Sequence, residues 1–325
     1  MKLGIVGSGM IVNDFLSMVG DLPNITLSAL LGTERSYEKL VSLQKDYGFQ
    51  QIYTQVDLFL AEADIDTVYI ALPNHLHFEY AKKALEQGKH VICEKPFTLN
   101  LEDFQTLKAL PIEKQLILVE AITNQFLPNY HFIKETLPTL GDIKVIECNY
   151  SQYSSRYDAF KEGTILPAFN PKMGGGALMD INIYNIHFVI GLLGKPESVK
   201  YYPNIENNID TSGILMLEYP ETKAVCIGAK DCSATIRSTI QGNKGSLAVI
   251  GATNDINEVE VQPQKNDTKL IHKNTHNHRM FEEFNVFQQL IEDNDIERSR
   301  QLLAHSENVM IVLDQALKSA NLKLG

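Results

Sequence analysis

The hydrophobic residues of this chain follow two patterns, and the change falls near residue 121. Before it, short apolar runs such as Leu3–Val6 alternate with longer amphipathic stretches. This alternation is typical of a parallel sheet in which each strand is followed by a helix. Further strands are predicted at residues 25–31, 67–72, 89–93 and 115–119, with one short strand between residues 46 and 67. We therefore expect an α/β domain, residues 1–121, with a doubly wound parallel sheet of six strands and helices on both faces.

Beyond residue 121 the pattern is typical of strands joined by turns. Strand patterns occur at residues 143–153, 198–202, 212–219, 224–230, 235–241 and 247–250. Turn residues such as Pro220 and Gly242 separate several of them. Helices are expected at residues 129–136, 280–294 and 298–322. Residues 122–325 are thus predicted to form an α+β domain with a large, mostly antiparallel open sheet, whose C-terminal helices are able to pack back on the first domain.

The stretch Gly174–Leu193 combines three glycines with a mostly apolar helical pattern. On a helix, Asp180, Tyr184 and His187 would share one stripe. Small residues fall close to that stripe, namely Gly176, Ala177 and Gly191. An acid and a phenol facing small residues on a buried helix indicate a binding or catalytic site. The alternative is a core helix whose polar groups bond internally, which is the role we expect for His187.

The first strand leads into a glycine-rich turn, Gly7-Ser8-Gly9, and then a helix. Strand, G-x-G and helix form the dinucleotide fingerprint, because the glycines let a pyrophosphate approach the helix N-terminus closely. Val12 stands where a third small residue is usual. The residues predicted to bind the cofactor phosphates are Gly7, Ser8, Gly9, Met10 and Ile11.

The second strand ends at Glu34 and Arg35, where such domains contact the adenosine ribose. An acid there accepts a hydrogen bond from the 2′-hydroxyl of NAD, whereas an arginine suits the 2′-phosphate of NADP. Arg35 favours NADP and Glu34 opposes it, so the sequence predicts NAD(P) with a preference for NADP.

Polar residues also follow the later strands of the first domain. Ligands of open α/β sheets bind at the carboxyl ends of the strands. We therefore assign further cofactor contacts to Leu72, Pro73, Asn74, His77, Glu94 and Lys95.

Charge and composition narrow the possible partners of the chain. The formal net charge is −11 over 325 residues, which argues against binding to nucleic acid or to an anionic membrane. We see no signal peptide and no apolar run near the ~18 residues that a membrane span needs. The four cysteines form no C-x-x-C pair and suit a reducing compartment, so we expect a cytoplasmic protein.

Taken together, these motifs resemble the glucose–fructose oxidoreductase / inositol dehydrogenase / rhizopine-catabolism (Gfo/Idh/MocA) superfamily over nearly the whole chain. The resemblance is carried by Gly7-Ser8-Gly9, Pro73-Asn74-His75-Leu76-His77, Glu94-Lys95-Pro96, and Gly174-Gly175-Gly176 followed by Asp180 and Tyr184. Inositol-dehydrogenase-like members have histidine at the last position. Tyr184 is more similar to the dimeric dihydrodiol / D-xylose dehydrogenase branch. Gln125 departs from the family pattern, in which many members have arginine.

The resemblance implies an NAD(P)-dependent oxidoreductase with a Rossmann domain and an α+β domain whose open sheet forms a homodimer or a dimer of dimers. The implied substrate is a small molecule: a sugar, a cyclic polyol or a trans-dihydrodiol. Lys95, Tyr184 and Asp180 would be catalytic and, with Arg156, would bind the substrate. Asn74 and His77 would shape the nicotinamide pocket, and no metal site is expected.

Two other functions remain open from the sequence. One is a non-catalytic NAD(P)-binding sensor or regulator on the same fold, which would need the dinucleotide turn but neither Lys95 nor Tyr184. The other is a glycosidase or isomerase that returns the hydride internally. The exact substrate, the direction of the reaction and the role of Gln125 are not determined by the sequence.

Overall fold

The computed structural model describes residues 1–264 and 267–325, and gives residues 112 and 113 only as part of a helix. The chain forms two compact units. The first unit comprises Met1–Thr98, Glu102–Ala121 and Met280–Ala304. The second unit comprises Leu99–Leu101, Ile122–Arg279 and His305–Gly325.

The first unit contains a six-stranded sheet in the order β3-β2-β1-β4-β5-β6, and all its neighbouring strands are parallel. Its strands are β1 Lys2–Val6, β2 Thr26–Leu31, β3 Gln51–Tyr53, β4 Thr67–Ile70, β5 His90–Glu94 and β6 Leu118–Ala121. β1 and β4, at its centre, are almost entirely buried because they carry Leu, Ile, Val and Tyr. The predicted parallel sheet is confirmed.

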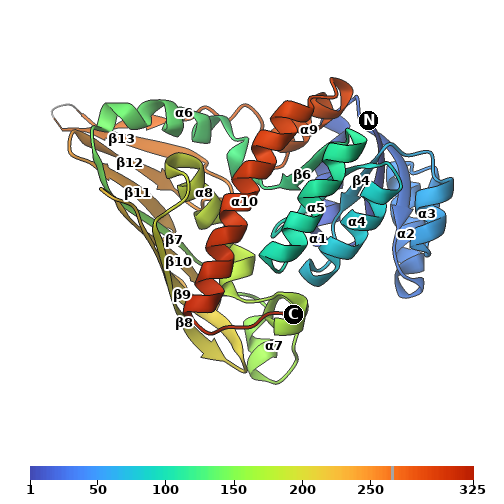
Figure 1. Cartoon of the computed structure of the whole chain (residues 1–325), viewed down its shortest axis with the longest axis horizontal. Coiled ribbons are helices and arrows are strands. Elements are labelled where there is room, and N and C mark those ends of the chain that lie inside the picture. The colour runs from blue at the N-terminus through green and yellow to red at the C-terminus, as the bar shows by residue number, and fades with distance from the viewer. Residues whose placement is uncertain (265–266) are drawn as a thin grey trace. The chain divides into compact units, whose positions relative to one another are not determined.

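Helices pack on both faces of this sheet (Figure 1). Phe15 of α1 lies against Tyr69 of β4, with ring centroids 5.4 Å apart. Phe59 of α3 fills the space where Gly4 of β1 lacks a side chain. Tyr69 pairs with Ile5, and successive residues of a strand point to opposite faces, so α1 and α3 lie on opposite faces. The helices are α1 Met10–Met18, α2 Tyr37–Tyr47, α3 Val56–Glu62, α4 His77–Glu86, α5 Leu101–Lys114 and α9 Phe281–Glu292.

The second unit contains an eight-stranded sheet in the order β14-β13-β12-β11-β7-β10-β9-β8. Its strands are β7 Ile143–Ser151, β8 Ser198–Glu206, β9 Ile209–Glu218, β10 Lys223–Ala229, β11 Arg237–Gly242, β12 Gly245–Ile250, β13 Glu258–Pro263 and β14 Lys269–Ile271. Every pair is antiparallel except β7 with β10. The mostly antiparallel sheet is therefore confirmed, although β13 and β14 were not predicted, because both are short and rich in polar residues.

The helices of the second unit are α6 Pro128–Thr136, α7 Tyr157–Lys161 and α8 Ile183–Leu193, and α10 Ile296–Ser319 ends in it. α8 packs on the buried face of the sheet, where Asn182, just before it, lies against Gly228 of β10. α6 and α8 lie on this side of the sheet in Figure 1. On the opposite face Tyr202, Ile214 and Val145 are exposed. We call this opposite side the outer face.

The segment Pro171–Leu193, counted together with the short turn before its three glycines, is long and apolar enough to cross a membrane by length and composition, which corrects the expectation that no apolar run approaches this length. About 72% of its most apolar window is buried within the protein. Its apolar character matches that of a core helix, because a helix covered by neighbours on all sides has no face that must be polar.

Candidate functional site

The dinucleotide turn follows β1 and opens at the N-terminus of α1. Gly7 has a φ of +119°, and a Cβ there would lie 2.4 Å from the carbonyl oxygen of Ala71. Only glycine fits both constraints. A Cβ at Gly9 would meet nothing within 4 Å, and Met10, which begins the helix, is 69% exposed. The turn therefore leaves the first backbone N–H groups of α1 open to an anion.

Arg35 and Glu34 lie at the end of β2 in a 3-10 turn (Glu34–Ser36), and both side chains are exposed. A third charged residue joins this region through the fold. Lys39, on the first turn of α2, donates a hydrogen bond to the backbone carbonyl of Ser8 in the dinucleotide turn. The sequence analysis missed Lys39, although a lysine one helical turn beyond Arg35 was a signal that could have indicated it.

His77 connects two of the loops predicted to contact the cofactor. Its side chain is fully buried, with Nδ1 2.9 Å from the carbonyl oxygen of Pro96 and Nε2 2.8 Å from that of Leu72. Burial, as the largest effect, lowers the pKa of His77 below its ordinary value. His77 thus lies between the residue after β4 and the Glu94-Lys95-Pro96 turn, with both ring nitrogens facing backbone carbonyl oxygens, to one of which a neutral imidazole donates.

Two buried carboxylates stabilise the same turn. Glu94 accepts a 2.5 Å hydrogen bond from the hydroxyl of Tyr69, and Glu120 accepts one from the backbone N–H of Phe97. Both glutamates are less than 10% exposed. Lys95, which follows Glu94 and precedes Phe97 by two positions, is half-buried. Hydrogen bonds to residues of β4 and β6 therefore stabilise the end of β5 and the turn that carries Lys95.

In the second unit, the three glycines precede the helix rather than form part of it. Gly174 and Gly176 have positive φ values, and the helix begins with a π-helical turn, Leu178–Asn182. Asp210 of β9 accepts a 2.7 Å hydrogen bond from the backbone N–H of Leu178. A Cβ at Gly176 would lie 2.1 Å from Asp210, so the small residue admits this carboxylate rather than a ligand. The prediction of one regular helix from Gly174 is wrong here, because the strand fixes the first turn.

Asp180 lies in this π-helical turn and pairs with a lysine that the sequence analysis did not select. Lys230 Nζ lies 2.6 Å from Asp180 Oδ2, and also donates to the carbonyl oxygen of Ala168 at 2.6 Å. The lysine side chain is 3% exposed, whereas that of Asp180 is 35% exposed. Lys230 follows β10, fifty positions from Asp180, so no local pattern indicated the pair.

Tyr184 lies in the first turn of α8 and is 8% exposed, with its ring 6.2 Å from that of Tyr150. Its backbone carbonyl accepts a hydrogen bond from Asn124. Gln125, whose role the sequence left open, donates to the carbonyl of His187. Asn124 and Gln125, which follow β6, therefore hold α8 at two backbone positions, Tyr184 and His187.

The space beside Gly191 is filled by protein. A Cβ there would lie 2.1 Å from the Tyr130 hydroxyl and 2.6 Å from Gln125 Oε1. Gly191, which the sequence places close to the stripe of Asp180 and Tyr184, therefore leaves no room for a ligand at this end of the helix. His187 lies in the core, with Nδ1 2.9 Å from His305 Nε2. Arg156 is half-buried and directly precedes α7.

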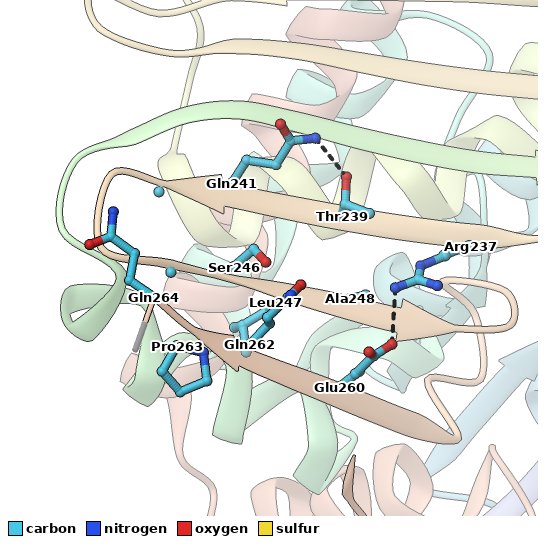
Figure 2. A pocket seen from close by; sticks show the side chains of 12 residues that line it. Arg237, Thr239, Gln241, Ser246, Leu247, Ala248, Glu260, Gln262, Pro263 and Gln264 are labelled. Atoms are coloured by element: carbon cyan, nitrogen blue, oxygen red, sulfur yellow. Dashed lines mark hydrogen bonds and ion pairs between the residues drawn. The ribbon is translucent and has the colours of Figure 1, made fainter. Parts of the chain in front are cut away.

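The outer face of the eight-stranded sheet holds a polar cavity of about 480 Å³. Figure 2 shows it between β11, β12 and β13, where Arg237 forms a 2.9 Å ion pair with Glu260 and Gln241 donates to Thr239. None of the predicted site residues lines it. Within residues 1–264 and 267–325, no group of three His, Cys, Asp or Glu side chains is placed to hold a metal ion.

Two family models match the chain. Residues 1–121 match the oxidoreductase family with an NAD-binding Rossmann fold, and residues 138–248 match the GFO/IDH/MocA C-terminal domain. The scyllo-inositol 2-dehydrogenase (NADP(+)) of Bacillus subtilis is 31% identical over 98% of this chain and 96% of its own length. This chain belongs to the GFO/IDH/MocA oxidoreductase family. The resemblance noted from the sequence motifs is confirmed.

Other known proteins are also similar to this chain. The trans-1,2-dihydrobenzene-1,2-diol dehydrogenase of Xenopus tropicalis is 28% identical over 76% of this chain and 74% of its own. A 3-ketoreductase from Actinomadura kijaniata, solved with NADP and TDP-benzene, has a TM-score of 0.86 at 20% identity and covers 98% of this chain and 97% of its own. At this identity the structural likeness shows the fold.

The first unit fits the nicotinamide dinucleotide that the family model implies. Gly7 brings the backbone close to the residue after β4, Gly9 leaves the helix N-terminus open, and Lys39 adds positive charge beside the turn. These are the backbone donors and the cation that a pyrophosphate requires.

Proposed function

We propose that the protein transfers a hydride between NAD(P) and a secondary alcohol or carbonyl of a sugar, cyclic polyol or trans-dihydrodiol. The proposal is carried by the presence of Lys95 and Tyr184 in addition to the dinucleotide turn. A sensor that only binds the cofactor would need the turn alone. The bound cofactor supplies the hydride transfer at its nicotinamide ring, and the protein supplies positioning and proton exchange.

Proton exchange in this scheme belongs to Tyr184. Its ionised oxygen, the phenolate, takes the proton of the substrate hydroxyl during oxidation, and the neutral phenol returns it during reduction. A phenol does this near neutral pH only when a cation favours its ionised form. We assign that role to Lys95. Asp180 accepts a hydrogen bond from a second hydroxyl of the substrate, and Arg156 is a further candidate for substrate contact.

Three further assignments accompany the activity. The cofactor preference is for NADP, supported by the exposed Arg35 and by Lys39 beside Ser8. The assembly is a homodimer or a dimer of dimers built on the outer face, supported by its exposed apolar residues. The location is the cytoplasm, supported by the four free cysteines, three of which are buried.

The test is a panel of D-glucose, D-xylose, scyllo-inositol and trans-1,2-dihydrobenzene-1,2-diol, each with NAD+ and NADP+, followed by the absorbance of the reduced cofactor. We expect at least one alcohol to be oxidised. Tyr184→Phe should lower kcat by about 10²–10⁴-fold, because positioned acid–base catalysis contributes that much. Tyr150→Phe is the matched control and should lose less. A chain that binds NADP+ but oxidises none of the panel would favour the sensor.

The same assay tests whether Lys95 and Tyr184 act together. If both serve one proton transfer, the double variant Lys95→Ala/Tyr184→Phe should be about as slow as the slower single variant. A loss equal to the product of the two single losses means that the residues act independently.

A further inference from the structure

Lys230 is a buried cation to which neither the sequence motifs nor the proposed reaction assigns a role. Lys230 directly follows β10, and its side chain is 3% exposed. Burying an ammonium is unfavourable unless charges and hydrogen-bond acceptors surround it. The contacts of Lys230 therefore indicate what it does in the fold.

Three of the groups near the Lys230 ammonium are described. It lies 2.6 Å from Asp180 Oδ2, it donates at 2.6 Å to the carbonyl oxygen of Ala168, and it stands 4.3 Å from the ring centroid of Phe169. Ala168 and Phe169 belong to the loop before the three glycines, whereas Asp180 belongs to the π-helical turn after them. One ammonium thus joins the two segments on either side of the glycines.

Asp180 differs from Lys230 in its access to solvent. About a third of its side chain is exposed, so a ligand can reach the carboxylate while the lysine stays covered. A charge-assisted hydrogen bond holds a carboxylate more firmly than a neutral one does. An opposite charge this close also favours the ionised form of the acid.

We propose that Lys230 is a positioning residue of the substrate site, which holds the Asp180 carboxylate in one orientation and keeps it ionised. An ionised carboxylate only accepts hydrogen bonds. The pair therefore presents a fixed acceptor to a hydroxyl group of the substrate. This inference rests on the proposed contact between Asp180 and the substrate.

The first test is Lys230→Met, assayed with scyllo-inositol and NADP+, or with the panel alcohol that the wild type oxidises best. We expect KM for the alcohol to rise about 10- to 100-fold, as for loss of a charge-assisted hydrogen bond. The Kd of NADPH, measured by fluorescence, should stay the same. Lys161→Met is the matched control, since Lys161 forms a 2.9 Å pair with Asp158 on the exposed surface. An unchanged KM in Lys230→Met overturns the proposal.

The double variant Asp180→Asn/Lys230→Met separates positioning from folding. If Lys230 acts through Asp180, the double variant should be no slower than Asp180→Asn alone. Losses that multiply would overturn the proposal. If Asp180→Asn itself has full activity, the proposed role of Asp180 is wrong. If Asp180→Asn is impaired but Lys230→Met is normal, only the inference about Lys230 is wrong.

A crystal structure provides a readout that does not depend on turnover. In Lys230→Gln, which keeps a donor but no charge, we expect the Asp180 carboxylate to move away from β10. If the single variants fail to fold, the double variant, which contains no unpaired charge, allows the same comparison for the amide at position 180. A carboxylate that keeps its place in Lys230→Gln, or an amide that occupies the same place in the double variant, would overturn the proposal.

Discussion

The polar side chains predicted to contact the cofactor differ in their surroundings. Lys39 places one cation at Ser8, while Arg35 and Glu34 place a cation and an anion, both exposed, in the turn after β2. His77 is different, because its ring nitrogens face the carbonyl oxygens of Leu72 and Pro96. It therefore acts on the Lys95 turn through the backbone and is a poor alternative to Tyr184 as an acid or base.

The cofactor preference can be tested at Arg35. We expect Arg35→Ala to weaken NADP+ binding about 10- to 100-fold, because a charge-assisted hydrogen bond to the 2′-phosphate is lost, and to leave NAD+ binding nearly unchanged. Titration calorimetry with both cofactors measures this. Lys45→Ala, in the last turn of the helix α2 that follows, is the control. NADP+ binding that is no weaker in Arg35→Ala would show that Arg35 does not bind the phosphate.

At the scale of elements, β9 and the π-helical turn are joined by Asp210. The carboxylate accepts hydrogen bonds from the backbone of Leu178 and the hydroxyl of Tyr201. Burial raises the pKa of Asp210 from 3.8 to about 6, although these bonds and the charge of Lys230 lower it in part. The start of the candidate substrate helix thus depends on an acid that the fold prefers to keep protonated.

This coupling predicts a pH dependence of stability. Between pH about 4 and about 6, the folded chain holds a proton that the unfolded chain has lost, so stability falls as pH rises through this window, by about 3 kcal/mol. Asp210→Asn should lack that loss. The difference between the urea midpoints of Asp210→Asn and wild type should therefore be more favourable to the variant at pH 7.5 than at pH 4.5.

The control for this experiment is Asp64→Asn, which removes an exposed carboxylate that pairs with Lys2. Its midpoint should stay close to that of the wild type at both pH values, since exposed pairs contribute little. If the gap between Asp210→Asn and wild type is the same at pH 4.5 and 7.5, Asp210 is not the group that titrates.

At the scale of the whole molecule, the outer face of the eight-stranded sheet is the feature that predicts assembly. Ile214 pairs with Tyr202 across β9 and β8, and they are 44% and 62% exposed. Such neighbouring apolar side chains on one face mark an interface. We expect a dimer at micromolar concentration by light scattering, and Ile214→Glu should give a monomer because it buries a charge in the contact.

Leu58→Glu is the control for that variant, since Leu58 is 43% exposed on α3 of the first unit. It should leave the mass of the assembly unchanged. A wild-type chain that is monomeric in this measurement removes the proposal, and a dimer that survives Ile214→Glu moves the interface elsewhere.

The periodicity of apolar residues by itself determined both sheets, because alternating strands and helices can bury their apolar faces in few ways. The sequence also indicated the dinucleotide turn, since the positive φ of Gly7 is a local property, whereas the close approach of Ala71 to Gly7 comes from a distant segment. Short polar strands such as β14 carried too weak a signal. The parallel pairing of β7 with β10 was also beyond the sequence, because pairing partners are chosen by the packing of the whole sheet.

Only the tertiary structure decided what surrounds the polar side chains. The sequence placed Asp180 and Tyr184 on one helix, but the ion pair of Asp180 joins residues 50 positions apart. It also treated Gly176 and Gly191 as room for a ligand, whereas Asp210 and Tyr130 occupy those spaces. The physical reason is the same in each case: a repeat along one element fixes which side a residue faces, while the partner it meets there comes from a distant segment brought close by folding.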